Sequence, residues 1–249
     1  MRFTTSLRFM KSTRKMTNNL SVINVPFIDT LGKKYTCACL AVDGKTVGKY
    51  LDEQAAGKQM EIFEHYTAEK LACAWSPGLD FEYCDRFMSE LLNSHKNMVI
   101  PYLLCDDDMD FSCLVITADI RYDGDYVYLD KLSSVNHSKS DDEREYGIAY
   151  SDAYTDEDWK MWKEMDCPAE LWEVGSKVWK KWIKENWQDE QLRRLRNYFF
   201  PYIQNPEHLN LIAEPKWKFE RSRFEEIIAF YQSVKTNELN CAIPDKLKG

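Results

Sequence analysis

Four aspartates lie within five residues of the chain, at Asp106, Asp107, Asp108 and Asp110. Carboxylate oxygens are the ligands that Ca²⁺ and Mg²⁺ prefer, so one interpretation of this cluster is a metal site. Dense negative charge also attracts a basic partner and speeds its association, so a second interpretation is an anionic docking surface. A third is a solvated loop between two strands, because apolar runs stand on both sides of the cluster.

The spacing of the cluster argues against a calcium loop. Asp106, Asp108 and Asp110 match the first three ligands of the pattern D-x-D-x-D. Phe111 then stands where the pattern needs Gly for its turn, and Thr117 stands where it needs a chelating Glu. A magnesium site meets another difficulty, since neighbouring aspartates on one loop point in different directions. We therefore expect no metal and no cofactor.

A zinc site is the other metal interpretation, with thiolates from Cys37, Cys39, Cys105 and Cys113. Strand alternation would place the first two on the same side of one strand. Neither pair has the C-x2-C spacing whose tight turn lets two sulfurs reach one ion. The sequence also shows no secretory signal. We expect reduced, mostly buried thiols without metal and a cytoplasmic location.

Common enzyme motifs are not found in the sequence. It contains no P-loop and no G-x-S-x-G elbow. The histidines are scattered, with no nucleophile at a recognisable spacing: His65, His95, His137 and His208. The pattern favours a protein that is not an enzyme. A metal-dependent hydrolase or nucleotidyl enzyme that uses the Asp106–Asp110 loop is the alternative.

Charge and apolar patterning exclude two classes of partner. The net charge of −8 is unfavourable for general nucleic-acid binding, which depends on neutralising phosphates. The stretch "KVWKKWIKENW" interleaves lysine with tryptophan. On a helix, however, Trp172, Trp179 and Trp182 share one side, which predicts an apolar core face opposite a solvated one. No apolar run reaches the roughly 18–20 residues of a membrane span, so neither nucleic acid nor membrane is expected.

Local patterns predict an α+β fold. The dipeptides Asp43-Gly44 and Asp123-Gly124 each stand between alternating apolar runs, which indicates two hairpin turns. Apolar residues at helical spacing predict a helix over 80–94. A C-terminal helix is predicted from the stripe Phe224, Ile227, Ile228 and Tyr231. We expect a mainly antiparallel sheet with packed helices, followed by a Trp-rich helical half.

Composition divides the chain into four predicted regions. Residues 1–28 carry basic residues and no acid, and are expected to form a disordered tail. Residues 29–135 form the α+β sheet region, and 136–158 form an acidic linker. Residues 159–249 hold seven of the eight tryptophans and are expected to be a helical region packed on the first.

The segments "AVDGKTVGKYL", "VIPYLLC", "DFSCLVITADI" and "VYLDKL" follow one another between residues 34 and 135. In this order they resemble uncharacterised bacterial accessory proteins of the toxin-immunity type. In those proteins a hairpin with a Gly-Lys turn precedes a Cys- and Asp-containing loop between two strands. The resemblance implies a binding role and carries over no function residue by residue, because the four aspartates and the Trp-rich half depart from it.

We therefore expect a soluble, acidic protein that binds a basic protein partner, in the form of an immunity or inhibitor protein that neutralises a basic toxin. Asp106, Asp107, Asp108 and Asp110 would be exposed and form part of the partner surface. Burying an unpaired carboxylate away from water costs several kcal/mol, so we expect these four side chains to stay in contact with solvent. A structural accessory protein is a further alternative, and the oligomeric state is left open.

Overall fold

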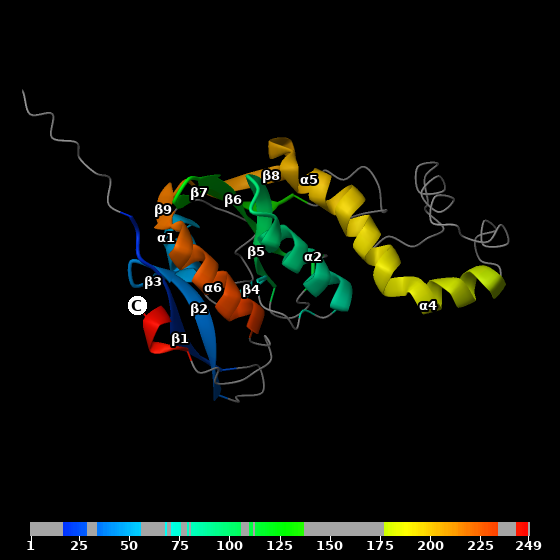
Figure 1. The fold of residues 1–249 in the computed structure, drawn as a ribbon, viewed down its shortest axis with the longest axis horizontal. Helices are drawn as coiled ribbons and strands as arrows, with labels where there is room; N and C mark the ends of the chain where they lie inside the picture. The colour runs from blue at the N-terminus through cyan, green and yellow to red at the C-terminus, as the bar shows by residue number, and fades with distance from the viewer. Residues whose placement is uncertain are drawn as a thin grey trace, which may run out of the picture.

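The chain combines antiparallel sheets with helices, as the α+β prediction requires (Figure 1). The computed structural model describes residues 17–28, 34–55, 71–75, 81–105, 113–136, 177–233 and 243–248, with Ala68, Leu79, Asp110 and Phe111. The first part of the predicted tail, nearly all of the acidic linker and the start of the predicted helical region lie outside the described residues.

The first sheet contains β1 (Leu20–Ile28), β2 (Lys34–Val42) and β3 (Lys45–Thr46) in that order. Asp43 and Gly44 join β2 to β3 with φ values of 51° and 81°, and two positive φ values are what a type I′ turn needs. The predicted first turn is therefore confirmed. The predicted disordered tail is wrong for residues 20–28, because β1 pairs with β2 along its whole length.

The second sheet has six strands: β4 (Ala72–Cys73), β5 (Met98–Leu104), β6 (Val115–Asp123), β7 (Tyr126–Val135), β8 (Leu209–Ala213) and β9 (Trp217–Glu220). The first four are neighbours in sequence order, and β8 and β9 both pair with β7. The region predicted to be helical thus contributes two strands. The long edge of β7 would otherwise expose unpaired backbone groups, which β8 and β9 satisfy in turn.

The second hairpin turn lies one residue later than predicted. Asp123 pairs with Tyr126, so the central residues of the turn are Gly124 and Asp125. Gly124 has a φ of 59°, and Asp125 is not among the residues with positive φ. Glycine at the first central position is the preference of a type II′ turn, which also suits the twist of the two strands.

The described helices are α1 (Val47–Ala55), α2 (Glu82–Ser94), α4 (Lys177–Arg194), α5 (Phe200–Gln204) and α6 (Arg221–Ser233). The helix predicted over 80–94 and the C-terminal helix are confirmed by α2 and α6. A π-helix, Leu195–Phe199, joins α4 to α5, and single 3-10 turns follow at Pro206–His208 and Asp245–Leu247. Asn186 interrupts α4 with φ −119° and ψ 15°.

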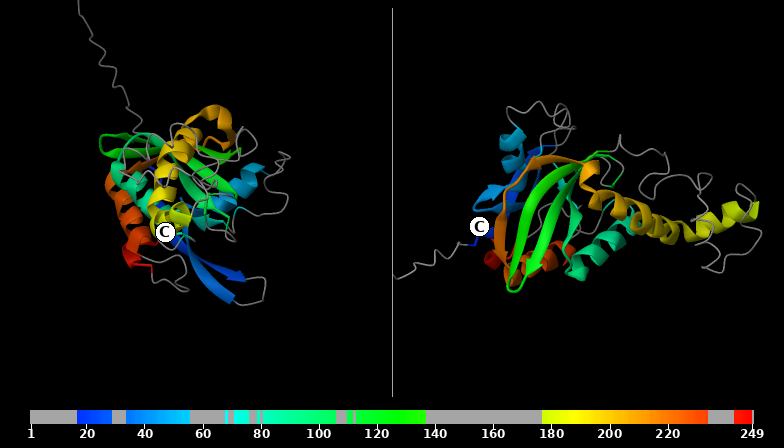
Figure 2. Two further views of the ribbon diagram at one scale, coloured as in Figure 1. Left: turned by 90° about the vertical axis from the view of Figure 1, so that its right-hand side faces the viewer. Right: turned by 90° about the horizontal axis from the view of Figure 1, so that it is seen from above.

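Helices α6 and α2 run side by side over one face of the second sheet (Figures 1 and 2). The predicted stripe of α6 is buried along its whole length. The ring of Phe224 has its centre 5.5 Å from that of Trp75 and 6.2 Å from that of Tyr122. The Tyr231 hydroxyl donates to the carbonyl of Ala38 in β2 at 2.9 Å. Helix α6 therefore ties the two sheets together.

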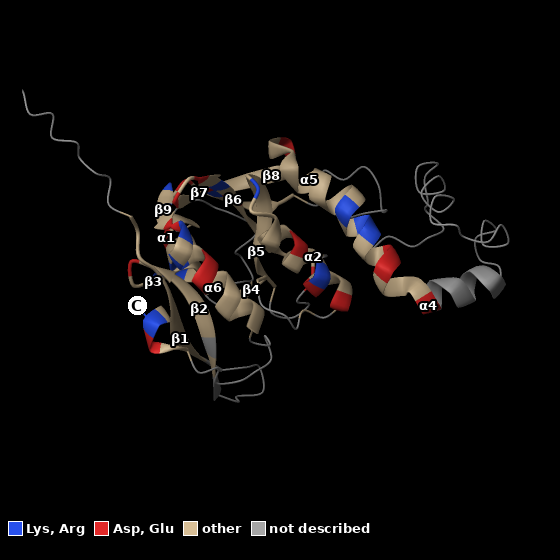
Figure 3. Ribbon diagram, viewed as in Figure 1, with Lys and Arg blue, Asp and Glu red and all other residues tan. Residues whose placement is uncertain are grey.

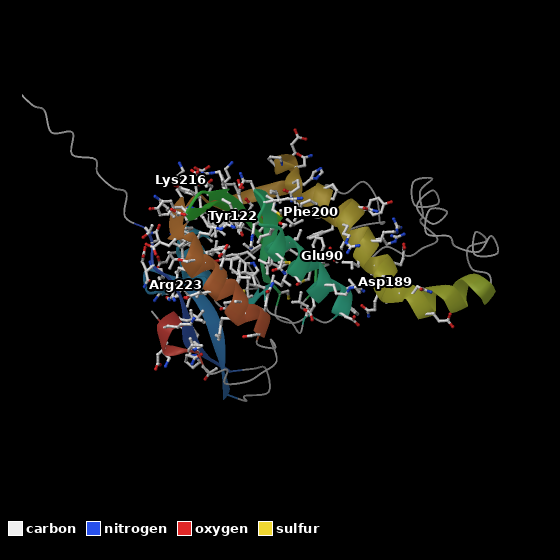
Figure 4. All side chains as sticks on the ribbon, in the orientation of Figure 1. Glu90, Tyr122, Asp189, Phe200, Lys216 and Arg223 are labelled. Atoms are coloured by element: carbon white, nitrogen blue, oxygen red, sulfur yellow. The ribbon has the colours of Figure 1, made fainter. Side chains whose placement is uncertain are left out.

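Ion pairs join α2 to α4 and to the π-helix that follows it, and both α2 and α4 carry acids and bases (Figure 3). Arg86 of α2 pairs with Asp189 of α4 at 2.6 Å. Arg196 of the π-helix pairs with Glu90 of α2. Figure 4 labels Glu90 and Asp189 at this contact. Because these side chains are largely exposed, each pair contributes modestly to stability, about 1 kcal/mol or less.

The C-terminal segment covers one edge of β1. Val22 and Lys248 form a parallel bridge. Arg223 of α6, labelled in Figure 4, donates from Nε to the carbonyl of Leu20 at 2.7 Å and from Nη1 to the carbonyl of Lys246 at 2.6 Å. These contacts satisfy backbone groups that an edge strand would leave open.

Candidate functional site

The acidic loop after β5 is described at its end. The aspartates at 106–108 lie outside the described residues, whereas Asp110 is 7% exposed. The expectation that all four carboxylates are exposed is therefore wrong for Asp110. Its neighbour Phe111 is fully buried, with its ring centre 5.6 Å from that of Phe87 and 5.1 Å from that of Phe199. This aromatic contact holds the end of the loop in the core.

The cysteines considered for zinc are described in part. Cys105 is buried, Cys39 and Cys113 are half-buried, and the side chain of Cys37 lies outside the described residues. Within the described part of the chain, no three His, Cys, Asp or Glu side chains lie close enough to hold a metal ion. Burial raises the pKa of the Cys73 thiol, which favours its protonated, unreactive form.

The tryptophans predicted to be buried are not described. Trp172 lies outside the described residues, and so do the side chains of Trp179 and Trp182 on α4. Their burial stays a prediction. Two other tryptophans are buried: Trp75, which follows β4, and Trp217, the first residue of β9.

A groove lies on the face of the second sheet opposite to α6. Thr117 and Asp119 of β6 line it, and Ser133 and Lys131 stand directly opposite them on β7. The rest of the lining comes from Val99, Gln204, Pro206, Leu209 and Leu211. Its volume is about 110 Å³. Sites for small molecules are roughly 300–1,000 Å³, so this groove suits one side chain better than a cofactor.

One wall of the groove is α5, which Gln204 fixes to the edge of β5. The side-chain Oε1 accepts from the Val99 N–H at 3.0 Å, and Nε2 donates to the Val99 carbonyl at 2.8 Å. The amide thus takes the place of a neighbouring strand. On the β8 side stands Leu211, which is 49% exposed. Leu211 therefore keeps apolar surface at this groove that a bound partner could bury.

Asp119 is the carboxylate within the groove. It is half-buried and receives no hydrogen bond or ion pair from the described residues. Burial raises its pKa, and the like charge of Asp130 adds to this rise. The positive charges of Lys131 and Arg121 lower the pKa of Asp119, but by less than burial and Asp130 raise it. The groove therefore contains a negative charge with too little positive charge around it.

Cations cover the tyrosines next to the groove. The Arg121 guanidinium lies 4.0 Å from the centre of the Tyr128 ring, and its Nε lies 3.2 Å from Asp130. Lys218 of β9 places its ammonium 3.5 Å from the centre of the Tyr126 ring. These contacts hold Arg121 on Tyr128 and Asp130, which explains why it leaves Asp119 without an ion pair.

Sequence reasoning missed this groove, although part of the signal was present. In "VITADIRYDGDYVYLDKL" polar residues alternate with apolar ones, which is typical of a sheet with one face outside the core. That alternation places Asp119 on an open face. Leu211 and Gln204 come from the region predicted to be helical, so no local pattern could bring them to the same groove.

No helix in the described part of the chain is both long and apolar enough to cross a lipid bilayer. Comparisons of the chain with models of protein families, with curated proteins and with solved structures give no match.

Proposed function

We propose that this protein acts by binding another protein, and that the groove on the second sheet receives a basic segment of that partner. The observation that carries the proposal is the half-buried Asp119, without an ion pair from the described residues, in the same groove as the exposed Leu211. A carboxylate of this kind is complementary to Lys or Arg. An exposed apolar side chain at a concave site adds area that binding can bury.

The charge of the whole chain also supports a basic partner. A net charge of −8 produces a field that steers a cationic protein toward the surface. In its most specific form, the proposal is an immunity or inhibitor protein that neutralises a basic toxin, as the resemblance over residues 34–135 implies. Asp106, Asp107 and Asp108 would add to the negative field.

Selection of a random displayed-peptide library against the full chain tests this proposal. Enriched peptides should carry a basic residue next to apolar ones. The variant Leu211→Gln should weaken their binding about tenfold, because loss of one buried apolar contact is worth about 1.4 kcal/mol. Raising the salt concentration should weaken binding by the wild type as well.

Phe81→Gln is the matched control, since Phe81 is also an exposed large apolar residue and stands at the start of α2, away from the groove. It should leave peptide affinity unchanged. Peptides that bind both variants as tightly as the wild type, or a library with no enriched sequence, would contradict the proposal.

A further inference from the structure

The geometry points to a lysine side chain of the partner as the group that this groove receives, with its ammonium held by Asp119, Thr117 and Ser133. This inference rests on the proposed function and specifies the chemistry of the same site.

The floor of the groove presents hydrogen-bond acceptors. Thr117 and Ser133 are both buried and face each other across β6 and β7. The Thr117 hydroxyl donates its proton to the Ser133 carbonyl at 3.1 Å. Its oxygen therefore has lone pairs left to accept with. The Ser133 hydroxyl makes no hydrogen bond with any described residue, so it is a second acceptor beside the Asp119 carboxylate.

The charges around Asp119 favour an added cation. On its own strand, Arg121 is held by Tyr128 and Asp130. On β7, Asp130 is a like charge and Lys131 is an opposite one. The lining residues from β5 and α5, Val99 and Gln204, carry no charge. Lys131 is exposed and makes no ion pair with a described residue, so its long side chain is able to move into solvent when a second cation enters.

An ammonium fits this floor better than a guanidinium. A lysine ammonium has three donors that point in different directions, whereas the arginine fork is planar and suits two coplanar acceptors. Here one carboxylate and two hydroxyls come from two strands. The apolar walls of Val99, Leu209 and Leu211 match the four-carbon stem of lysine. The volume of about 110 Å³ also favours the more compact head group.

NMR titration of the full chain with three synthetic peptides tests the inference. The probes are acetyl-Leu-Lys-Leu-amide, its arginine analogue and its norleucine analogue, which lacks the ammonium. The lysine peptide should shift the amide signals of Thr117, Asp119 and Ser133. It should bind about tenfold more tightly than the norleucine peptide and at least about threefold more tightly than the arginine peptide.

Two variants with opposite effects sharpen the test. Asp119→Asn should reduce the affinity for the lysine peptide to that for norleucine. Lys131→Met removes a competing cation and should strengthen lysine binding, about threefold. Asp123→Asn is the control, because Asp123 is an exposed acid on the same strand whose contact with Arg121 is long, at 3.8 Å. It should leave the affinity unchanged.

The lysine assignment would be overturned if the lysine peptide bound no more tightly than the norleucine peptide, or no more tightly than the arginine peptide. Either result would leave the proposed function uncontradicted. The proposed function itself fails on different data, namely selected peptides that are insensitive to Leu211→Gln. The two failures are therefore distinguishable.

Discussion

The two faces of the hairpin formed by β6 and β7 differ in what covers them. On one face the Tyr122 ring lies 6.2 Å from Phe224 of α6, and burial raises the pKa of Tyr122 to about 12. On the other face Asp119 lines the groove, and Arg121 lies over the Tyr128 ring. Arg121 and Tyr122 are adjacent in β6 and lie on opposite faces, because successive side chains of a strand point to opposite faces.

This difference indicates a division of roles. The face under α6 has aromatic contacts whose removal leaves a cavity, so it should determine stability. The face with the groove has charged and partly exposed side chains, which contribute little to stability and remain accessible to a partner. Substitutions on the two faces should therefore differ in size and, at one position, in sign.

The largest effect is expected for Phe224→Ala on the covered face. The buried ring contacts Trp75 and Phe219, and its truncation should lower the free energy of unfolding by about 3–5 kcal/mol. Urea unfolding followed by circular dichroism measures this. Leu211→Ala on the open face is the control and should cost about 1 kcal/mol or less. Similar losses for both variants would remove the distinction between the faces.

A smaller loss is expected for Gln204→Ala at the edge of the groove. The substitution leaves the N–H and carbonyl of Val99 without their side-chain partner, which should cost about 1–3 kcal/mol. Hydrogen exchange of the Val99 amide should become faster. Gln204→Glu retains the acceptor for that amide and should protect it more than Gln204→Ala does. Unchanged exchange in Gln204→Ala would mean that Gln204 does not hold this edge.

Arg121→Met on the open face should cost about 0.5–1 kcal/mol. The variant keeps an apolar stem over Tyr128 and loses the cation and the pair with Asp130. Because the guanidinium is partly exposed, the difference from wild type should shrink in 1 M salt, where charges are screened. Thermal unfolding at two salt concentrations measures it. A salt-independent loss would point to packing as the cause.

The smallest effect, with the opposite sign, is expected for Asp119→Asn. Burial, Asp130, Lys131 and Arg121 together leave the pKa of Asp119 above its ordinary value of 3.8. The folded state therefore holds this proton at pH values where the unfolded chain has released it. Stability from this group falls as pH rises from 3.8 through the raised pKa.

Asp119→Asn has no carboxyl group to deprotonate, so it does not lose this stability as the pH rises. Its Tm should therefore be slightly higher than that of the wild type at pH 7. The difference should decrease toward pH 4, where the wild-type carboxyl is increasingly protonated. Differential scanning calorimetry at both pH values measures it. A lower Tm for the variant at pH 7 would show that the carboxylate stabilises the fold through a partner.

The predicted partner surface and the proposed groove carry different sequence signals. The Asp106–Asp110 cluster stands out as a run of acids in the sequence, and its described member, Asp110, is buried next to Phe111. Asp119 was one polar residue among several in an alternating strand. Its environment depends on Asp130 and Lys131 across the ladder, and on the bulge in β6–β7 pairing between Asp119 and Ile120.

Local patterns were sufficient for the Asp43-Gly44 turn, helix α2, helix α6 and the strands β5 to β7, because turn geometry and side-chain periodicity act over a few residues. Those same rules missed β1, β8 and β9. A short strand is stable only through a partner, and the partners of β8 and β9 lie far away in sequence on β7. The groove required Val99, Asp119, Gln204 and Leu211 to meet, and only that long-range pairing brings them together.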